Sequence, residues 1–283
     1  MKILTFGEKK IIKSIFKQWV ISFFKQIIKK KRFIMISAPI FQNQYIYDRY
    51  SNKLSLLKIK SISDWYTIYQ VFIKEDYKLD DLSRYSDLIL FYKNIIRDKK
   101  IPIIFDCGGN IGITTKYFSI IYPAAKIICI EPDKNNIYMA IENNLNQPNI
   151  EFIHSAVGSA EGIGKIIDPG LGNNAYRIKK SELDSGGENL VKILSINNKL
   201  KQIDSNSFVP FYMKIDIEGY EDELFSKNYE WIERFPIIAI ELHDWMLKKS
   251  ASSRNFLIAI SSFNRDFINI GENIFSISNQ VSK

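Results

Sequence analysis

Residues 103–112 read IIFDCGGNIG. An apolar run ends in Asp106, and Gly108, Gly109 and Gly112 follow it. Glycine lets a backbone turn tightly and approach a ligand closely, and the free N–H groups of a helix start can face that ligand. The stretch therefore predicts a strand, a ligand-binding turn and a helix, with a binding site where the strand ends.

The glycine spacing and the acid at the strand end separate two classes of cofactor. A dinucleotide site requires G-x-G-x-x-G around a pyrophosphate, and this turn lacks that spacing. A carboxylate suits a cationic ligand better than a phosphate. We therefore expect Asp106, Gly108, Asn110 and Gly112 to bind S-adenosylmethionine (SAM), which carries a sulfonium and an ammonium. The alternative is a purely structural strand-to-helix turn.

From residue 101 onward, strand-like and helical segments alternate. Such alternation predicts a Rossmann-like α/β fold, a mostly parallel twisted sheet with helices on both faces. Ligands of such sheets bind beyond the carboxyl ends of the strands. The expected strands cover 101–105, 126–130, 150–157, 191–196, 211–215 and 237–242, and the expected helices 112–122 and 134–146.

The positive charge is concentrated at the N-terminus. The chain of 283 residues has a net charge of +8, and residues 1–32 hold ten Lys and Arg against one Glu. The remainder is close to neutral, so no nucleic-acid partner is expected. Apolar residues recur at helical spacing over 9–31, with Lys, Ser and Gln on the other face. This basic amphipathic helix either lies on a membrane surface or packs on protein, and both alternatives stay open.

We expect three segments: the basic helix over 1–34, a cap or subdomain over 35–100 and a SAM-binding domain over 101–283. Polar loop insertions are expected at 158–174 and 181–189. The sequence shows no signal peptide and no apolar run long enough to span a bilayer. The expected location is the cytoplasm, with peripheral contact at the inner face of the membrane as one version of it.

Two further strand ends carry candidate cofactor residues. Glu131 ends the second strand, nineteen residues after Gly112, where an acid can accept both ribose hydroxyls of a nucleoside. The alternative for Glu131 is a surface residue that caps a helix. Ala156, near the end of the third strand, leaves room for an adenine ring. His154 is expected to be a packed or surface residue rather than a catalyst.

The last two strand ends are rich in acids. KIDIEGYE, residues 214–221, brings Asp216 and Glu218 close to a strand end, and the alternative is an acidic helix start. Glu241 and His243 share one face of the next strand if it stays extended. His243 titrates near neutral pH, so it can act as a general base. The D-x-E and E-x-H residues could instead bind a divalent metal, but their spacing does not match a strong ligand template, so no metal ion is expected.

In order and spacing, residues 55–250 resemble the FkbM-type methyltransferases, a class I SAM-dependent family. The resemblance implies that Asp106, Gly108 and Glu131 bind SAM, that Asp216 lines the transfer site, and that Glu218 and His243 face the acceptor. The family commonly has Ala where this chain has Gly109. The matching segments are SDWYTIYQVFIKEDY, FDCGGNIG, AKIICIEPDKNN, HSAVG, MKIDIEGYE and ELH.

The resemblance implies SAM-dependent O-methyl transfer to a hydroxyl, often one on a sugar. We expect the acceptor to be a sugar or a cell-surface glycan precursor, with His243 or Asp216 as the general base. One alternative is a catalytically inactive SAM-fold protein that acts in membrane-associated assembly or binding. A second is a nucleotide-dependent enzyme, against which the missing G-x-G-x-x-G and P-loop motifs argue. A homo-oligomer is compatible with the sequence.

Overall fold

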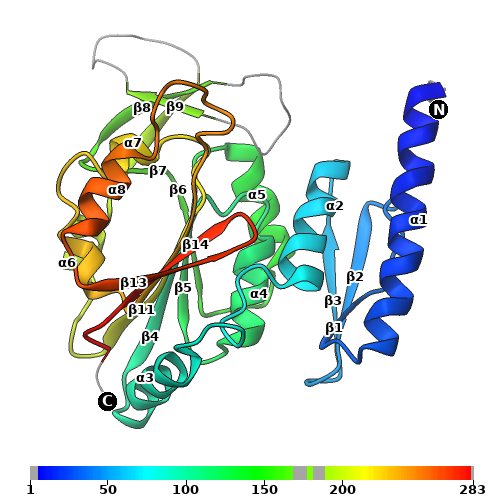
Figure 1. The fold of residues 1–283 in the computed structure, drawn as a ribbon, viewed down its shortest axis with the longest axis horizontal. Coiled ribbons are helices and arrows are strands. Elements are labelled where there is room, and N and C mark those ends of the chain that lie inside the picture. Colours follow the sequence, from blue (N-terminus) through cyan, green and yellow to red (C-terminus); the bar gives the residue numbers. More distant parts are fainter. Residues whose placement is uncertain (1–5, 168–176, 181–188, 282–283) are drawn as a thin grey trace. The chain divides into compact units, whose positions relative to one another are not determined.

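The computed structural model describes residues 6–167, 177–180 and 189–281. The chain forms two compact units, residues 1–76 and 77–283, which are coloured along the sequence in Figure 1. This division differs from the predicted boundaries at 34 and 100. The helix α3 (Tyr85–Arg97) belongs to the second unit, because Tyr92 packs its ring against Tyr122 and Phe211.

The first unit joins the N-terminal helix to a small antiparallel sheet. Its sheet has the order β1-β2-β3. Ser61 and Asp64 form a capping box that starts α2, and a π-helical segment, η1, continues it. The elements are α1 (Phe6–Ile28), β1 (Phe33–Met35), β2 (Asn43–Asp48), β3 (Lys53–Lys58), α2 (Ile62–Ile68) and η1 (Tyr69–Lys74).

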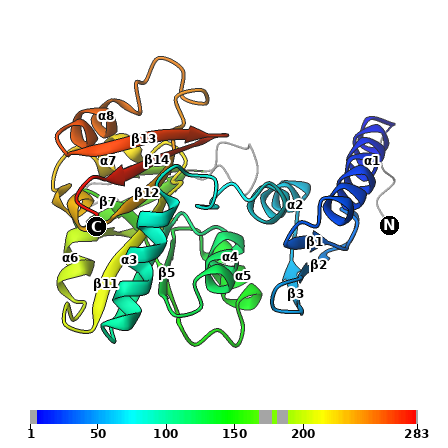
Figure 2. The same cartoon turned by 60° about the horizontal axis from the view of Figure 1, so that its bottom comes forward.

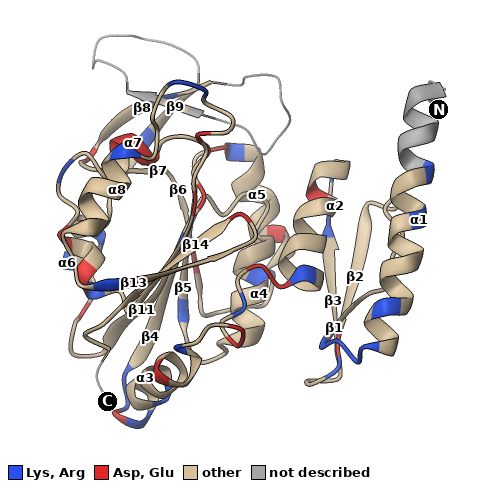
Figure 3. Cartoon of the chain, in the orientation of Figure 1, with Lys and Arg blue, Asp and Glu red and all other residues tan. Residues whose placement is uncertain are grey.

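Helix α1 packs on its own unit through both polar and apolar side chains, among them Ile15, Ser22 and Gln26. The Gln26 side chain, 2% exposed, accepts a hydrogen bond from Met35 N (2.8 Å) and donates one to Ser22 Oγ (2.8 Å). The sequence predicted Ile15 on the apolar face and Ser22 and Gln26 on the polar face, and the structure buries all three. Large apolar side chains are left exposed on α1, and Lys residues lie along it (Figure 3). The exposed apolar residues are Phe16, Ile21, Phe24, Ile27 and Ile28.

The second unit is built on a seven-stranded sheet with the order β13-β14-β12-β11-β4-β5-β6. β14 runs antiparallel to both of its neighbours, and the other neighbouring strands are parallel. The expected α/β fold class is confirmed. The strands are β4 (Ile101–Cys107), β5 (Lys126–Glu131), β6 (Ile150–His154), β11 (Phe208–Ile215), β12 (Ile237–Glu241), β13 (Arg265–Ile270) and β14 (Asn273–Ser278).

Helices cover both faces of this sheet (Figures 1 and 2). Alternate residues along each strand face opposite sides, so the apolar strands supply a core to each layer. Phe105, Met213 and Ile238 pack with α6, α7 and α8, whereas Cys129 packs with α5 on the other face. The helices are α4 (Ile113–Ile121), α5 (Lys134–Asn143), α6 (Ile196–Lys201), α7 (Glu221–Leu224), η2 (Glu230–Arg234) and α8 (Arg254–Ser261).

A separate four-stranded sheet has the order β7-β10-β8-β9. The strand expected over 191–196 is β10, which pairs with β7 and β8 instead of joining the main sheet. Within the expected insertions, 162–167 is a strand, while 168–176 and 181–188 lie outside the described residues. The strands are β7 (Ala156–Gly158), β8 (Gly162–Ile167), β9 (Arg177–Lys180) and β10 (Leu190–Ser195).

The strand order also fixes where a ligand can bind. The chain builds outward from β4 through β5 to β6, then returns to the opposite side of β4 with β11 and β12. The topological switch point therefore lies between β4 and β11, and a crevice forms beyond the carboxyl ends of such strands. Among the described helices, none combines the length and apolar character that crossing a bilayer requires.

Candidate functional site

A pocket lies at this switch point, where four of the expected strand-end segments meet. Its walls come from the turn after β4, the end of β5, the start of β7, the loop after β11 and residues of α5 and β9. Asp216 and Glu218, which the sequence proposed, share this pocket with Ser155 and Tyr220, which it missed. The lining residues are Gly108, Asn110, Ile130, Glu131, Pro132, Asn136, Ser155, Ala156, Val157, Ile178, Asp216, Ile217, Glu218 and Tyr220.

The turn after β4 is held against β5 by its backbone. The N–H groups of Gly108 and Gly109 both donate to Ile130 O, at 2.9 and 3.0 Å. Gly108 has a φ of 78°, and a Cβ there would lie 1.8 Å from Asp216 O. Only glycine fits this position. Without a side chain at Gly108, the backbone of the turn can lie directly against the end of β11.

The other two glycines of the turn serve packing. A Cβ on Gly112 would come within 3 Å of Ala140 on α5, and Gly112 is not among the pocket-lining residues. The structure gives Gly112 a helix-packing role, and its expected contact with the cofactor stays a prediction. A Cβ on Gly109 would lie 2.3 Å from the buried Cys129 Sγ. An alanine at position 109 would force that thiol to move.

Asp106 lies beneath the pocket rather than in its wall. The side chain is 0% exposed, accepts a hydrogen bond from Thr115 Oγ1 (2.6 Å), and pairs with Lys214 Nζ (3.2 Å). This corrects the expectation that Asp106 touches a cationic ligand, because a buried lysine already neutralises it. Asp106 therefore positions the turn indirectly, through Lys214, which also donates a hydrogen bond to Gly108 O.

Lys214 is the residue that the sequence reasoning passed over. Its Nζ donates to Gly108 O (2.7 Å) and lies 3.5 Å from Asp216 Oδ2. Burial by itself lowers the pKa of Lys214, but the charges of Asp106 and Asp216 raise it well above the ordinary value. A lysine inside the apolar strand FYMKI was the available signal, since such a charge requires a partner.

Glu131 is held in the pocket wall by two backbone groups. Asn110 N donates to Oε2 (2.8 Å) and Asp133 N donates to Oε1 (2.9 Å). Burial raises the pKa of Glu131 to about 7, and these hydrogen bonds only partly oppose the rise. Each carboxylate oxygen can accept more than one hydrogen bond, so Glu131 can still bind a diol. Ala156, also predicted, lines the same pocket.

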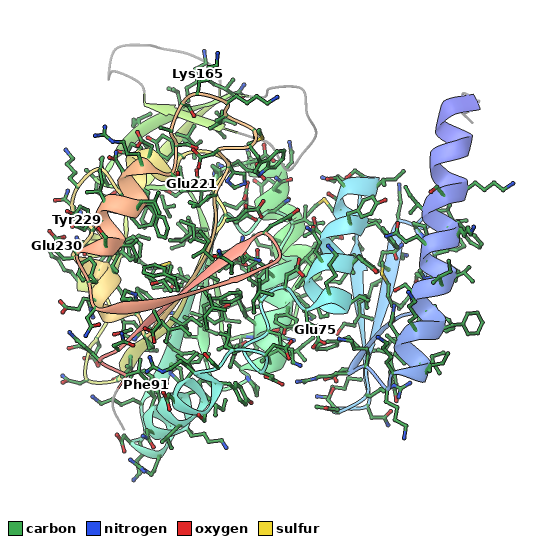
Figure 4. All side chains as sticks on the ribbon, viewed as in Figure 1. Glu75, Phe91, Lys165, Glu221, Tyr229 and Glu230 are labelled. Atoms are coloured by element: carbon green, nitrogen blue, oxygen red, sulfur yellow. The ribbon has the colours of Figure 1, made fainter. Side chains whose placement is uncertain are left out.

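His243 connects the last two strand ends. Its ring is 2% exposed, and its Nδ1 is 2.8 Å from Glu221 Oε1 at the start of α7; Glu221 is labelled in Figure 4. Its Nε2 faces Asp216 Oδ1 (3.6 Å), Glu218 Oε2 (3.6 Å) and Glu241 Oε1 (3.7 Å). We call Asp216, Glu218, Glu241 and His243 the acid cluster.

The charges within the acid cluster shift its titration. Burial raises the pKa of Glu218 and of Glu241 to about 8, and the charge of Asp216 adds to both shifts. Burial by itself lowers the pKa of His243, but the hydrogen bond to Glu221 and the charge of Asp216 outweigh it and raise the pKa to about 9. The near-neutral titration expected for His243 is therefore not what the surrounding charges produce.

Comparisons with known proteins give a fold-level likeness only. No family model matches the sequence, and no curated protein matches it. Among solved structures, the O-methyltransferase TomG from Streptomyces achromogenes, in complex with SAM, is similar at 10% identity and a TM-score of 0.39, over 78% of this chain and 92% of that one. The O-methyltransferase from Bacillus cereus, in complex with S-adenosylhomocysteine (SAH), is similar at 12% identity and a TM-score of 0.37, over 78% and 93%. Likenesses this weak carry no argument about activity.

The buried pair of Lys214 and Asp106 yields a stability prediction. Lys214→Met leaves the Asp106 carboxylate buried without its cation, which costs about 3–5 kcal/mol in the free energy of unfolding. The double variant Asp106→Asn with Lys214→Met removes both charges and recovers most of that loss. Urea unfolding of the three proteins measures this. Equal stability of the single variant and the parent, or no recovery in the double variant, contradicts the assignment.

Proposed function

We propose that this protein is a SAM-dependent O-methyltransferase of the FkbM type that methylates a hydroxyl of a sugar or glycan precursor. One observation carries the proposal: Glu131 presents a carboxylate, held by two backbone N–H groups, in a pocket that also contains the Gly108 turn and two members of the acid cluster. The nucleoside binds beside Glu131 and the Gly108 turn, and the methyl transfer takes place beside the acid cluster.

The chemistry of the pocket residues fits SAM. Glu131 accepts the ribose hydroxyls, and the small side chain of Ala156 leaves space for the adenine. The Gly108 backbone and Asn110 line the space for the amino-acid part of SAM. Asp216 supplies the negative charge that the ammonium of SAM requires. When bound, SAM supplies a methyl group on a positively charged sulfur.

The protein's own task is alignment and proton removal. Holding acceptor and methyl group in line, away from water, can supply ~7–11 kcal/mol. The acceptor oxygen forms a bond to the methyl carbon as the carbon–sulfur bond breaks, and that electron pair stays on sulfur. The hydroxyl proton passes to the Asp216 carboxylate, because the pKa of Glu218, raised to about 8, leaves that side chain mostly protonated at neutral pH. Since the pKa of His243 is raised to about 9, His243 already holds a proton at neutral pH and is the weaker candidate for the base.

The two alternative functions make different demands on this pocket. A catalytically inactive SAM-fold protein has no need of the buried Glu131, whose raised pKa makes its ionised form costly. A dehydrogenase requires a glycine pattern for pyrophosphate, which the 108–112 turn lacks. Both observations favour a working SAM site.

Binding measurements on the whole chain test the proposal. Calorimetry is expected to show binding of SAM and SAH and none of NAD or a UDP-sugar. Ionised Glu131 is the better acceptor for the ribose, and its pKa in the free protein is about 7. The affinity for SAM therefore falls as the pH drops through 7, by up to about tenfold per pH unit.

Glu131→Gln weakens SAM binding by roughly 10–100-fold, as expected for lost hydrogen bonds to a charged group, and removes this pH dependence. The matched control, Glu233→Gln, changes an exposed acid of η2 and leaves both properties intact. NAD binding in place of SAM, or the same SAM affinity in Glu131→Gln, contradicts the proposal.

The same proposal places the enzyme at a membrane surface through α1. The helix turns Ser22 and Gln26 toward its own unit and leaves Phe24, 57% exposed, and Ile28, 76% exposed, on the outside. Outward apolar side chains with neighbouring lysines match an interfacial helix on anionic lipid. A lipid-linked acceptor would then be within reach of the enzyme.

Vesicle co-sedimentation tests the membrane contact. The protein is expected to sediment with vesicles that contain anionic phosphatidylserine and to stay in solution with neutral phosphatidylcholine. Phe24→Asp with Ile28→Asp abolishes sedimentation because it places two charges on the apolar face. The control, Leu257→Asp with Ile258→Asp, adds the same charges to exposed apolar positions of α8 and sediments like the parent. Undiminished sedimentation of the α1 variant argues against the contact.

A further inference from the structure

His243 has one ring nitrogen without a hydrogen bond. Nδ1 is engaged by Glu221, but within the described residues Nε2 makes no hydrogen bond and has carboxylate oxygens only at 3.6–3.7 Å. The side chain is 98% removed from solvent, with a relative exposure of 2%. Nε2 and these carboxylate oxygens surround one point, where a bound cation would have all of them as neighbours.

The atoms around Nε2 are arranged for a cation. Asp216 presents Oδ2 to Lys214 and leaves Oδ1 facing His243. One ligand atom each from Asp216, Glu241 and His243 lies within 4.8 Å of the others. Three carboxylates of the acid cluster converge here, and the charge of Lys214 is already shared with Asp106. The side chains that converge here can therefore bind a cation once they are deprotonated.

Glu221 completes the arrangement from behind the ring. It is 0% exposed and lies on the far side of the imidazole, 2.8 Å from Nδ1. A histidine that binds a metal through one nitrogen typically donates its other N–H to a carboxylate, which fixes the tautomer and the ring orientation. A surface ion pair has no need of such a buried carboxylate.

We propose that Asp216 Oδ1, Glu241 Oε1 and His243 Nε2 bind one divalent first-row cation, of which Mn²⁺ is the representative. Mixed carboxylate and imidazole ligands favour such an ion over Ca²⁺ or Mg²⁺, which prefer oxygen alone. With ligand bonds of about 2.1 Å, two ligand atoms at a tetrahedral angle are about 3.4 Å apart. The observed 3.6 and 3.7 Å separations from Nε2 are within a few tenths of an ångström of that value.

The site changes the roles of the acid cluster in the proposed methyl transfer. A His243 that binds a metal cannot take a proton through the same nitrogen, and Asp216 is engaged as a ligand. A bound cation would lower the pKa of the acceptor hydroxyl, and its charge would favour the ionised form of Glu218, which could then receive the hydroxyl proton. This role rests on the proposed function, but binding of the metal does not.

Titration of the chelator-treated, full-length protein with Mn²⁺ tests the site. The electron paramagnetic resonance signal measures free Mn²⁺, and the bound Mn²⁺ is the difference from the total. One bound Mn²⁺ per chain is expected. Asp216→Asn and Glu241→Gln keep the side-chain shape and weaken binding at least tenfold, and Glu221→Gln weakens it by about 10–100-fold through the ring it orients. The matched control is His154→Ala, which removes the chain's other histidine, an exposed one.

SAM titrated into the same samples separates the two proposals. Stoichiometric Mn²⁺ binding that is lost in Glu241→Gln and kept in His154→Ala supports the site, whether or not SAM binds. Absence of Mn²⁺ binding up to millimolar concentration overturns the site, and so does binding that Glu241→Gln leaves unchanged. Mn²⁺ binding without SAM binding removes the proposed function and leaves the metal site standing.

Discussion

The buried contact of Lys214 with the ends of β4 and β11 is the constraint on which the site depends. Its Nζ lies near Asp106 and Asp216 and donates to the carbonyl of Gly108. Because a buried charge is tolerated only with partners, this lysine holds an acid below the pocket, the glycine turn beside it and an acid in its wall at fixed separations. The switch point of the sheet provides the crevice, and Lys214 fixes the positions of residues that line it.

Much of the fold could be predicted from local pattern. The strands ending at Asp106, Glu131 and Asp216 lie in apolar runs that are followed by polar ends and helical periodicity, and the structure contains them in one sheet. The pairing of β10 could not be predicted, because a six-residue strand with one buried face fits the edge of either sheet. The β13–β14 hairpin was missed because its alternation follows a long irregular segment, and its position beside β12 depends on long-range contacts.

The prediction of the site was strongest where the chemistry was local. Glu131, Gly108 and Asn110 were expected to bind a cofactor, and all three line the pocket. The role of Asp106 depended on Lys214, which lies more than a hundred residues away, so spacing alone could not reveal the pair. From the sequence, Glu221 could either bind the substrate or start a helix, and only the folded chain places its carboxylate behind the ring of His243.

The central claim is that this pocket binds the nucleoside of SAM against Glu131. A crystal structure of the full chain in complex with SAH tests it most directly. The account predicts ribose hydroxyls within hydrogen-bond distance of Glu131, adenine beside Ala156 and the sulfur on the side of Asp216. Adenosine density elsewhere on the protein, or a ribose with no contact to Glu131, would contradict it.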